Sequence, residues 1–214
     1  MKFKNFDEIG KNKKKENFNQ LYDFMPDRCF RMLITGPSGC GKTNTLVNML
    51  VEPLVYYDKI YLYSKNLEQD KYEYLHERID PISKEAGYQI IEESNDQILP
   101  VSSLSKVNQK LVIFDDFVCE KNQNPLIEYF IMSRHKNCNV IYLSQSYYKT
   151  PKDIRNNCTH FCVFDFPSRR EKSMICSDTQ VPKEVYEKAT FDPYSFLYID
   201  KPRKFVSKNF DEKI

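Results

Sequence analysis

The sequence predicts an α/β protein with a mostly parallel central sheet, flanking helices and a C-terminal hairpin. Short apolar runs alternate with segments of helical spacing, a glycine loop follows the first run, and a later apolar run ends in two acids. The 214 residues suffice for one domain with short extensions. Because the net charge is only +2, any contact with nucleic acid must come from a local patch.

The strongest motif is residues 36–43, G-P-S-G-C-G-K-T, which fits the phosphate-binding (Walker A) pattern G-x-x-x-x-G-K-[ST]. An apolar run at 30–35 predicts a buried strand before it, and apolar residues at helical spacing over 46–54 follow it. Glycines let the backbone point its N–H groups into a hollow that the helix N-terminus also faces, which suits a polyphosphate. Three of the five glycines lie in this loop, so a glycine-rich background does not explain the match.

This loop predicts a site for ATP and Mg²⁺. Lys42 is expected to reach the β- and γ-phosphates, and Thr43 to offer its hydroxyl to the metal. The predicted nucleotide-binding residues are Gly36, Pro37, Ser38, Gly39, Cys40, Gly41, Lys42 and Thr43.

We divide the chain into a basic N-terminal extension (1–27), a P-loop domain that we expect to be an ATPase (28–207) and a C-terminal tail (208–214). Four lysines lie between positions 11 and 15, which fits a solvated extension or a basic arm for nucleic acid or a partner. The other elements follow from periodicity: strands at 58–64, 88–91, 111–114, 139–144 and 159–165, helices at 68–79 and 125–134, a loop at 146–157, loop and helix at 167–190, and a hairpin of 194–199 with 204–207.

The second informative stretch is K-L-V-I-F-D-D-F, residues 110–117, a buried strand that ends in two acids. Carboxylates at the carboxyl end of a parallel strand point into the crevice where ligands bind, as in the Walker B pattern. Asp115 is expected to hold Mg²⁺ through water, and Asp116 to orient or deprotonate the attacking water. A strand followed by an acidic turn is the alternative, and the phosphate loop about 70 residues earlier makes it the weaker one.

Gln145 ends the strand predicted at 139–144. In a parallel sheet that end faces the nucleotide, so the amide can hydrogen-bond both the γ-phosphate and the attacking water. A glutamine after a strand is uninformative by itself, and the prediction depends on its position.

Two other groups of residues have open interpretations. Cys158, His160 and Cys162 alternate on a predicted strand, and with Cys176 they could bind zinc; an ordinary buried face explains them better because no C-x-x-C pair is present. A cationic and aromatic run near the ligand edge fits either contact with phosphates in a ring pore or solvated loops. Its members are Tyr147, Tyr148, Lys149, Lys152, Arg155, Arg169, Arg170 and Lys172.

Four segments together resemble the FtsK/HerA superfamily: T-G-P-S-G-C-G-K-T, then I-F-D-D, then R-H-K-N-C-N-V-I-Y-L-S-Q, then P-K-D-I-R. Within it, residues 28–166 are similar to the genome-packaging ATPases of large DNA viruses, virophages and Polinton-like elements. An extra strand between the Walker A and Walker B strands is expected, which is typical of a RecA-like (ASCE) P-loop NTPase.

The resemblance implies an ATP-driven translocase that moves double-stranded DNA into a preformed capsid. It implies a homo-oligomeric ring (hexamer or pentamer), a capsid or portal vertex protein as partner, and action in the host cytoplasm or nucleus at the site of virion assembly, with association with the virion as a further option. It also assigns Lys42 and Thr43 to Walker A, Asp115 and Asp116 to Walker B, and Gln145 to the sensor position, with Asp116 standing where many relatives have glutamate.

Rings of this kind usually complete each site with an arginine from the neighbouring subunit. Arg155, which follows the strand that ends at Gln145, is one candidate. Arg134, at the end of the helix predicted for 125–134, is the other, and it could act only in trans. A solvated or helix-capping arginine is the alternative for each.

Two other functions stay open at this stage: a P-loop nucleoside or small-molecule kinase, and a nucleotide-gated assembly protein. The double-Asp strand with a following glutamine favours hydrolysis by water over a kinase, and the absence of N-K-x-D disfavours a GTPase. Seven scattered cysteines, no apolar run of membrane-span length and no signal-peptide core predict a soluble, intracellular protein without a membrane partner.

Overall fold

The computed structural model describes residues 29–51, 55, 57–86, 89–93, 98–210 and 212–214. The basic extension predicted for 1–27 lies outside the described residues. Within them, the strands are β1 (Arg31–Thr35), β2 (Lys59–Ser64), β3 (Gln89–Glu93), β4 (Lys110–Asp115), β5 (Cys138–Ser144), β6 (His160–Phe164), β7 (Phe196–Asp200), β8 (Phe205–Lys208) and β9 (Glu212–Lys213).

The helices fill the connections between the strands. They are α1 (Lys42–Val51), α2 (Asp70–Ala86), α3 (Asn124–Met132), α4 (Lys152–Asn157), α5 (Arg169–Thr179) and α6 (Lys183–Ala189), with short 3-10 turns at Val101–Ser103 and Ser133–Lys136.

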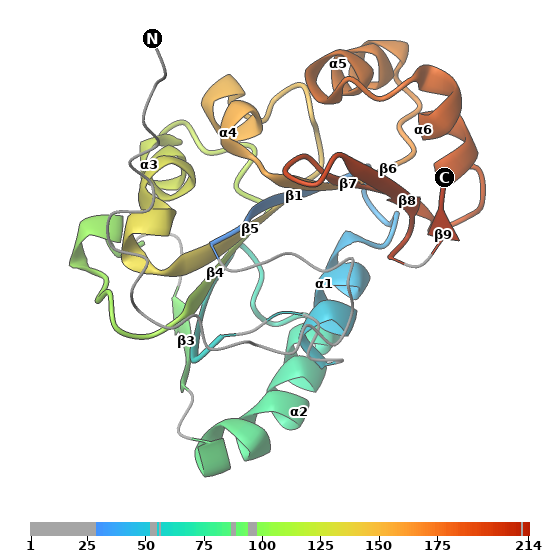
Figure 1. Cartoon of the computed structure of the whole chain (residues 1–214). Helices are drawn as coiled ribbons and strands as arrows, with labels where there is room; N and C mark the ends of the chain where they lie inside the picture. Colours follow the sequence, from blue (N-terminus) through green and yellow to red (C-terminus); the bar gives the residue numbers. More distant parts are fainter. Residues whose placement is uncertain (1–28, 52–54, 56, 87–88, 94–97, 211) are drawn as a thin grey trace, which may run out of the picture.

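The nine strands form one sheet in the order β3-β2-β4-β5-β1-β6-β7-β8-β9 (Figure 1). The pairs from β3 to β6 are parallel, and the pairs from β6 to β9 are antiparallel. The predicted mostly parallel sheet and the C-terminal hairpin, β7 with β8, are therefore confirmed. β5 lies between β1 and β4, which confirms the extra strand expected of a RecA-like fold.

Helices cover both faces of the sheet, with α1 and α2 on one face and α3 to α6 on the other (Figure 1). Every residue of β4 and β5 is buried, as expected for central strands enclosed on both faces. This burial explains why both strands appear in the sequence as nearly continuous apolar runs. Tyr142, Phe130 and Phe161 pack in the core under α3 to α6, and Leu46, Tyr72 and Ile141 in the core under α1 and α2.

Three segments differ from the sequence-based expectations. The loop predicted for 146–157 contains α4, which begins directly after Pro151, whose φ of −51° suits a helix start. The segment 167–190 holds two helices, because Gln180 adopts a left-handed conformation (φ 60°) that ends α5 before α6 begins. The segment 208–214, set apart as a tail, includes β9, which pairs with β8.

The structure does not assemble the zinc site that the cysteine spacing allowed. Cys158 follows α4 rather than lying on β6, so the alternation does not reach it, and it packs on the opposite face of the sheet from Cys162. Among the described residues, no group of three or more His, Cys, Asp or Glu side chains could hold a metal ion.

His160 instead lies against a buried carboxylate at the start of the hairpin. Its Nε2 lies 3.4 Å from Oδ2 of Asp200, and the backbone N–H of Arg203 donates to Oδ1 of Asp200 at 3.0 Å. Burial alone would raise the pKa of Asp200, but the contacts with His160 and Arg203 outweigh it and hold this pKa below its usual value. The carboxylate therefore joins β6, β7 and the turn before β8.

We expect Asp200→Asn to lower the free energy of unfolding at neutral pH by about 1–3 kcal/mol, because a buried hydrogen-bonded charge is lost. The stabilisation from a lowered carboxyl pKa is complete above the unfolded value of about 3.9 and disappears as pH falls through the folded value. Urea unfolding across acidic pH should thus show a shallower loss of stability in the variant below about pH 4. An unchanged acid profile would contradict this role for Asp200.

Candidate active site

The candidate site lies at the carboxyl edge of three adjacent strands. β5 pairs with β1 and with β4, so the loop after β1, the acids at the end of β4 and the glutamine after β5 meet at one edge of the sheet. The backbone N–H of Gly36 donates to the carbonyl of Ser144 at 3.2 Å, which joins the start of the loop to the end of β5.

The loop of residues 36–43 has the close packing and the unusual dihedrals that glycines permit. A Cβ on Gly36 would lie 2.6 Å from both Cys40 Sγ and Phe164 Cβ, so no side chain fits there. Gly39 and Gly41 have φ values of +76° and +112°, which L side chains rarely adopt. The pattern of glycines that predicted this loop therefore has a steric cause at each position.

Lys42 currently bonds the loop itself. Its Nζ donates to the carbonyl oxygens of Gly36 and Pro37, each at 2.8 Å, and the residue is only 9% exposed. Burial lowers the pKa of Lys42. The nearby Cys40, Asp115 and Asp116 act in the opposite direction and raise it. The ammonium is held in the hollow of the loop, where a bound phosphate would replace the two carbonyls as its partner.

Asp115 is a buried carboxylate with a phenol as its partner. It ends β4 at 5% exposure, and the hydroxyl of Tyr72 on α2 donates to its Oδ2 at 2.6 Å. Burial raises the pKa of Asp115, and the bond from Tyr72 partly offsets this by stabilising the anion. The sequence predicted a helix over 68–79, and nothing in its spacing showed that the hydroxyl of Tyr72 reaches the acid.

Asp116 and Gln145 are in direct contact. Gln145 Nε2 donates to Asp116 Oδ1 at 2.9 Å, and the backbone N–H of Asp116 donates to the carbonyl of Leu143 at 3.3 Å. Asp116 has a φ of 63°, a left-handed conformation that aspartate tolerates better than most residues. This turn aims its carboxylate toward the end of β5, where Gln145 lies.

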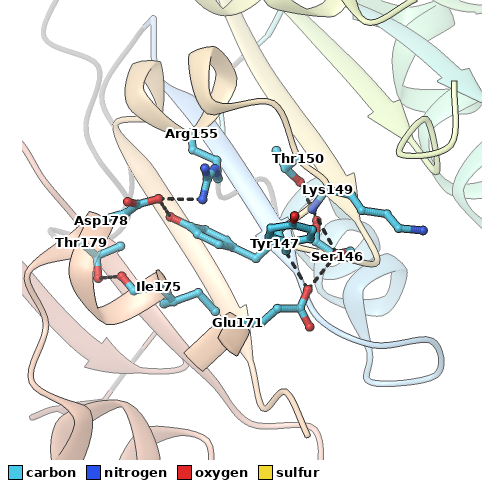
Figure 2. Close-up of polar contacts among 10 residues, drawn as sticks. Ser146, Tyr147, Lys149, Thr150, Arg155, Glu171, Ile175, Asp178 and Thr179 are labelled. Carbon is cyan, nitrogen blue, oxygen red and sulfur yellow. Dashed lines mark hydrogen bonds and ion pairs between the residues drawn. The ribbon is translucent and has the colours of Figure 1, made fainter. Parts of the chain in front are cut away.

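The turn after Gln145 is fixed to α5 and α4 by polar contacts (Figure 2). Ser146 Oγ donates to Glu171 Oε1 at 2.8 Å, and the N–H of Tyr148 donates to the same oxygen at 3.4 Å. At the other end of α5, Asp178 Oδ2 accepts from the hydroxyl of Tyr147 at 3.0 Å and from Nη1 of Arg155 at 2.8 Å. Sequence patterns gave no signal for these partners, since residues over 20 positions apart form the contacts.

The two candidate arginines lie in different surroundings, and within the described residues neither contacts the loop or the acids. The Arg155 side chain is 10% exposed, pairs with Asp178, and lies 4.9 Å from the ring centroid of Tyr147. Arg155 is thus buried and already paired within this chain, and its predicted role at a neighbouring site stays a prediction. Arg134 is exposed at the 3-10 turn that precedes β5, at the opposite edge from the loop, and its action in trans stays a prediction.

Comparison with known proteins identifies the family. Residues 15–186 match the family described as Poxvirus A32 protein. The chain belongs to this family. It is 32% identical over 155 residues to the DNA packaging protein OPG160 of variola virus, and 34% identical to that of monkeypox virus. The matches cover 69% of this chain but 57% and 52% of those proteins, so the chain spans little more than half the length of these relatives.

Solved structures agree with the fold. B204, the DNA-packaging ATPase from Sulfolobus turreted icosahedral virus, superposes with a TM-score of 0.61 at 15% identity, over 84% of this chain and 96% of that chain. The packaging NTPase of Sulfolobus turreted icosahedral virus 2, in complex with AMPPCP, gives a TM-score of 0.60 at 15% identity over the same shares. The family match and these structures confirm the resemblance predicted from the sequence and the RecA-like fold. In the described part of the chain, no helix has the length and apolar character needed to cross a membrane.

We expect Tyr72→Phe to lower the free energy of unfolding by about 1.5–3 kcal/mol, because Asp115 loses a hydrogen bond to its charge. The control is Tyr129→Phe, which removes the hydroxyl of another buried tyrosine that donates to a neutral acceptor, the carbonyl of Leu99 at 2.7 Å, and it should cost about 1 kcal/mol.

A double-mutant cycle with Asp115→Asn separates two contributions of the Tyr72 hydroxyl: its hydrogen bond to the charged carboxylate and its packing in the core. In that background the cost of Tyr72→Phe should fall to about 1 kcal/mol, since the acceptor is neutral. The same cost in both backgrounds, measured by urea unfolding, would show that the hydroxyl does not support the charge of Asp115.

Proposed function

We propose that this chain is an ATPase that couples ATP hydrolysis to the translocation of double-stranded viral DNA into a capsid. The observation that carries the proposal is the contact between Asp116 and Gln145 at the same edge as the loop around Lys42. An acid and an amide that touch beside a phosphate loop are suited to orienting a water against a terminal phosphate. The relatives named DNA packaging protein, and the fold shared with packaging NTPases, support a role in DNA packaging.

ATP binding would begin at the loop. The ammonium of Lys42 would leave the carbonyls of Gly36 and Pro37 and turn to the β- and γ-phosphates. Its two hydrogen bonds to carbonyls would thus be replaced by hydrogen bonds to phosphate oxygens. The glycine backbone supplies N–H groups, and the N-terminus of α1 adds its positive end.

The residues present also fit Mg²⁺. Thr43 and Asp115 offer a hydroxyl and a carboxylate, the oxygen donors that this ion prefers, and Tyr72 fixes the orientation of the carboxylate. When bound, the ion would neutralise charge that develops on the phosphates during transfer. Thr43 would hold the ion through its hydroxyl, and Asp115 would hold it through water.

Asp116 is the proposed base that orients or deprotonates the attacking water, and Gln145 positions that water and detects the γ-phosphate. Their hydrogen bond links the two functions, because a change at either side chain alters the other. The aspartate is one methylene shorter than the glutamate of many relatives, and the bond from Gln145 fixes where its shorter carboxylate points.

A ring of subunits would complete each site. Arg134 is the proposed trans arginine, because it is exposed and no ion pair with another described residue engages it, whereas Arg155 is already paired. The DNA, a capsid or portal vertex protein and further copies of this chain are the proposed partners. The proposed place of action is the infected host cell at the site of virion assembly.

The test of this function is ATP hydrolysis by the purified chain with and without duplex DNA. Strong stimulation by DNA would support a translocase. An equal rate of hydrolysis with and without DNA would favour a nucleotide-gated assembly protein. Transfer of phosphate to a nucleoside would identify a kinase. Either result overturns the proposal.

We expect Asp116→Asn to retain ATP binding but to lower turnover at least 100-fold, in the range of about 10²–10⁴ for the loss of a general base. Asparagine tolerates the left-handed φ of this position and keeps an oxygen for Gln145, so the fold should survive. Asp153→Asn, the same change on the exposed face of α4, is the matched control. Lys42→Ala should abolish hydrolysis, and normal turnover in Asp116→Asn would remove Asp116 as the base.

A further inference from the structure

An exposed cationic surface, here called the basic face, lies beside the turn that follows Gln145. It consists of Tyr148, Lys149, Lys152, Arg169 and Arg170, all of them exposed. The structure separates these five from the rest of the cationic run in the sequence. Tyr147 and Arg155 are buried, and Lys172 pairs with Asp165 at 2.7 Å.

A stacked pair fixes the centre of the basic face. The guanidinium of Arg170 lies 3.7 Å from the ring centroid of Tyr148, so the start of α5 and the turn are joined across the surface. Tyr148 keeps 46% of its surface exposed, although it is a large aromatic residue. Stacking holds the planar guanidinium in one orientation, so less entropy is lost when its N–H groups bind an anion.

The charge of the basic face is not cancelled locally. Within the part of the chain that the structure describes, no ion pair involves Lys149, Lys152, Arg169 or Arg170. Figure 2 shows the Lys149 side chain extending away from the network around it. Of the nearby acids, Glu171 accepts from Ser146 and from the N–H of Tyr148, Asp165 pairs with Lys172, and Asp153 is exposed on α4.

We propose that the basic face binds the phosphate backbone of duplex DNA and that Glu171 couples this binding to Gln145. The inference rests on the function proposed above and names the surface through which DNA would act on the site. Phosphate contact is favoured over stacking on exposed bases, because the guanidinium of Arg170 already covers a face of the Tyr148 ring.

The coupling follows a short chain of contacts. Gln145 bonds Asp116, and the next residue, Ser146, bonds Glu171, whose carboxylate also accepts from the N–H of Tyr148. Glu171 directly follows Arg170 on α5. A shift of Gln145 when the γ-phosphate is bound or released would therefore move the turn against α5 and change the spacing of Tyr148, Lys149 and Arg170.

The binding test compares the full chain with the double variant Lys149→Ala/Arg170→Ala, using fluorescence anisotropy of a short labelled duplex at several salt concentrations. We expect weaker binding to every sequence, and a salt slope of log K that is reduced by about two, roughly one for each lost phosphate contact. The matched control, Lys183→Ala/Lys188→Ala, removes two exposed charges from α6 and should leave both quantities unchanged. A labelled single strand of the same length separates backbone contact from base stacking.

The coupling test uses Glu171→Ala with Glu171→Gln as the conservative variant. Glu171→Ala should still bind duplex DNA, but the ratio of its ATP hydrolysis with DNA to that without DNA should fall toward one, because Ser146 and the N–H of Tyr148 lose their shared acceptor. Glu171→Gln keeps an oxygen for Ser146 and Tyr148, so it should retain most of the stimulation. Circular dichroism melting of each variant controls for folding.

Each outcome decides a separate claim. If the wild type binds no DNA and shows no stimulation, the proposed function itself fails. The basic face is not the site for duplex phosphates if the wild type binds duplex DNA and the double variant binds it with the same affinity and salt slope. The same conclusion follows if the double variant loses affinity only for the single strand. Stimulation of Glu171→Ala equal to that of the wild type would overturn the coupling.

Discussion

The candidate site depends on the position of β5 between β1 and β4. Parallel pairing on both sides aligns the carboxyl ends of the three strands, so Gly36, Asp116 and Gln145 are brought to one edge although about 110 residues separate the first from the last. β5 is buried throughout, so a shift in its register would place apolar side chains in the wrong layer. The hydrogen bonds of Ser144 and Leu143 with the neighbouring loops then fix the two flanking segments to this strand.

Two kinds of contact hold the acids of β4, and they suit different tasks. Asp115 is buried and bonded by Tyr72, which keeps the carboxylate in one place, as its proposed role in holding a metal ion requires. Asp116 lies in a left-handed turn and bonds the exposed Gln145, so its surroundings can change when a ligand arrives. Strain at such a residue is retained where the local geometry serves a function, and the position of Asp116 beside the loop fits this explanation.

The fold and the core of the site could be predicted because each depends on short-range sequence patterns. The glycines of the loop, the apolar run before Asp115 and the strand before Gln145 each occupy fewer than ten residues. The partners of these residues could not be predicted: the contacts of Tyr72 with Asp115 and of Glu171 with Ser146 join segments 43 and 25 residues apart. Periodicity also missed α4, whose six residues are too few to show a helical repeat.

Arg155 illustrates how burial changes the meaning of a cationic residue. An arginine in the segment after the Gln145 strand matched the position expected of a catalytic residue from a neighbouring subunit. Its guanidinium instead packs on Tyr147 and pairs with Asp178, and removing it from these contacts would leave buried polar atoms without partners. Arg155 therefore stabilises the junction between α4 and α5 on which the turn after Gln145 rests. A trans residue must come from a surface that a second copy can reach, and Arg134 at the exposed turn before β5 meets that condition.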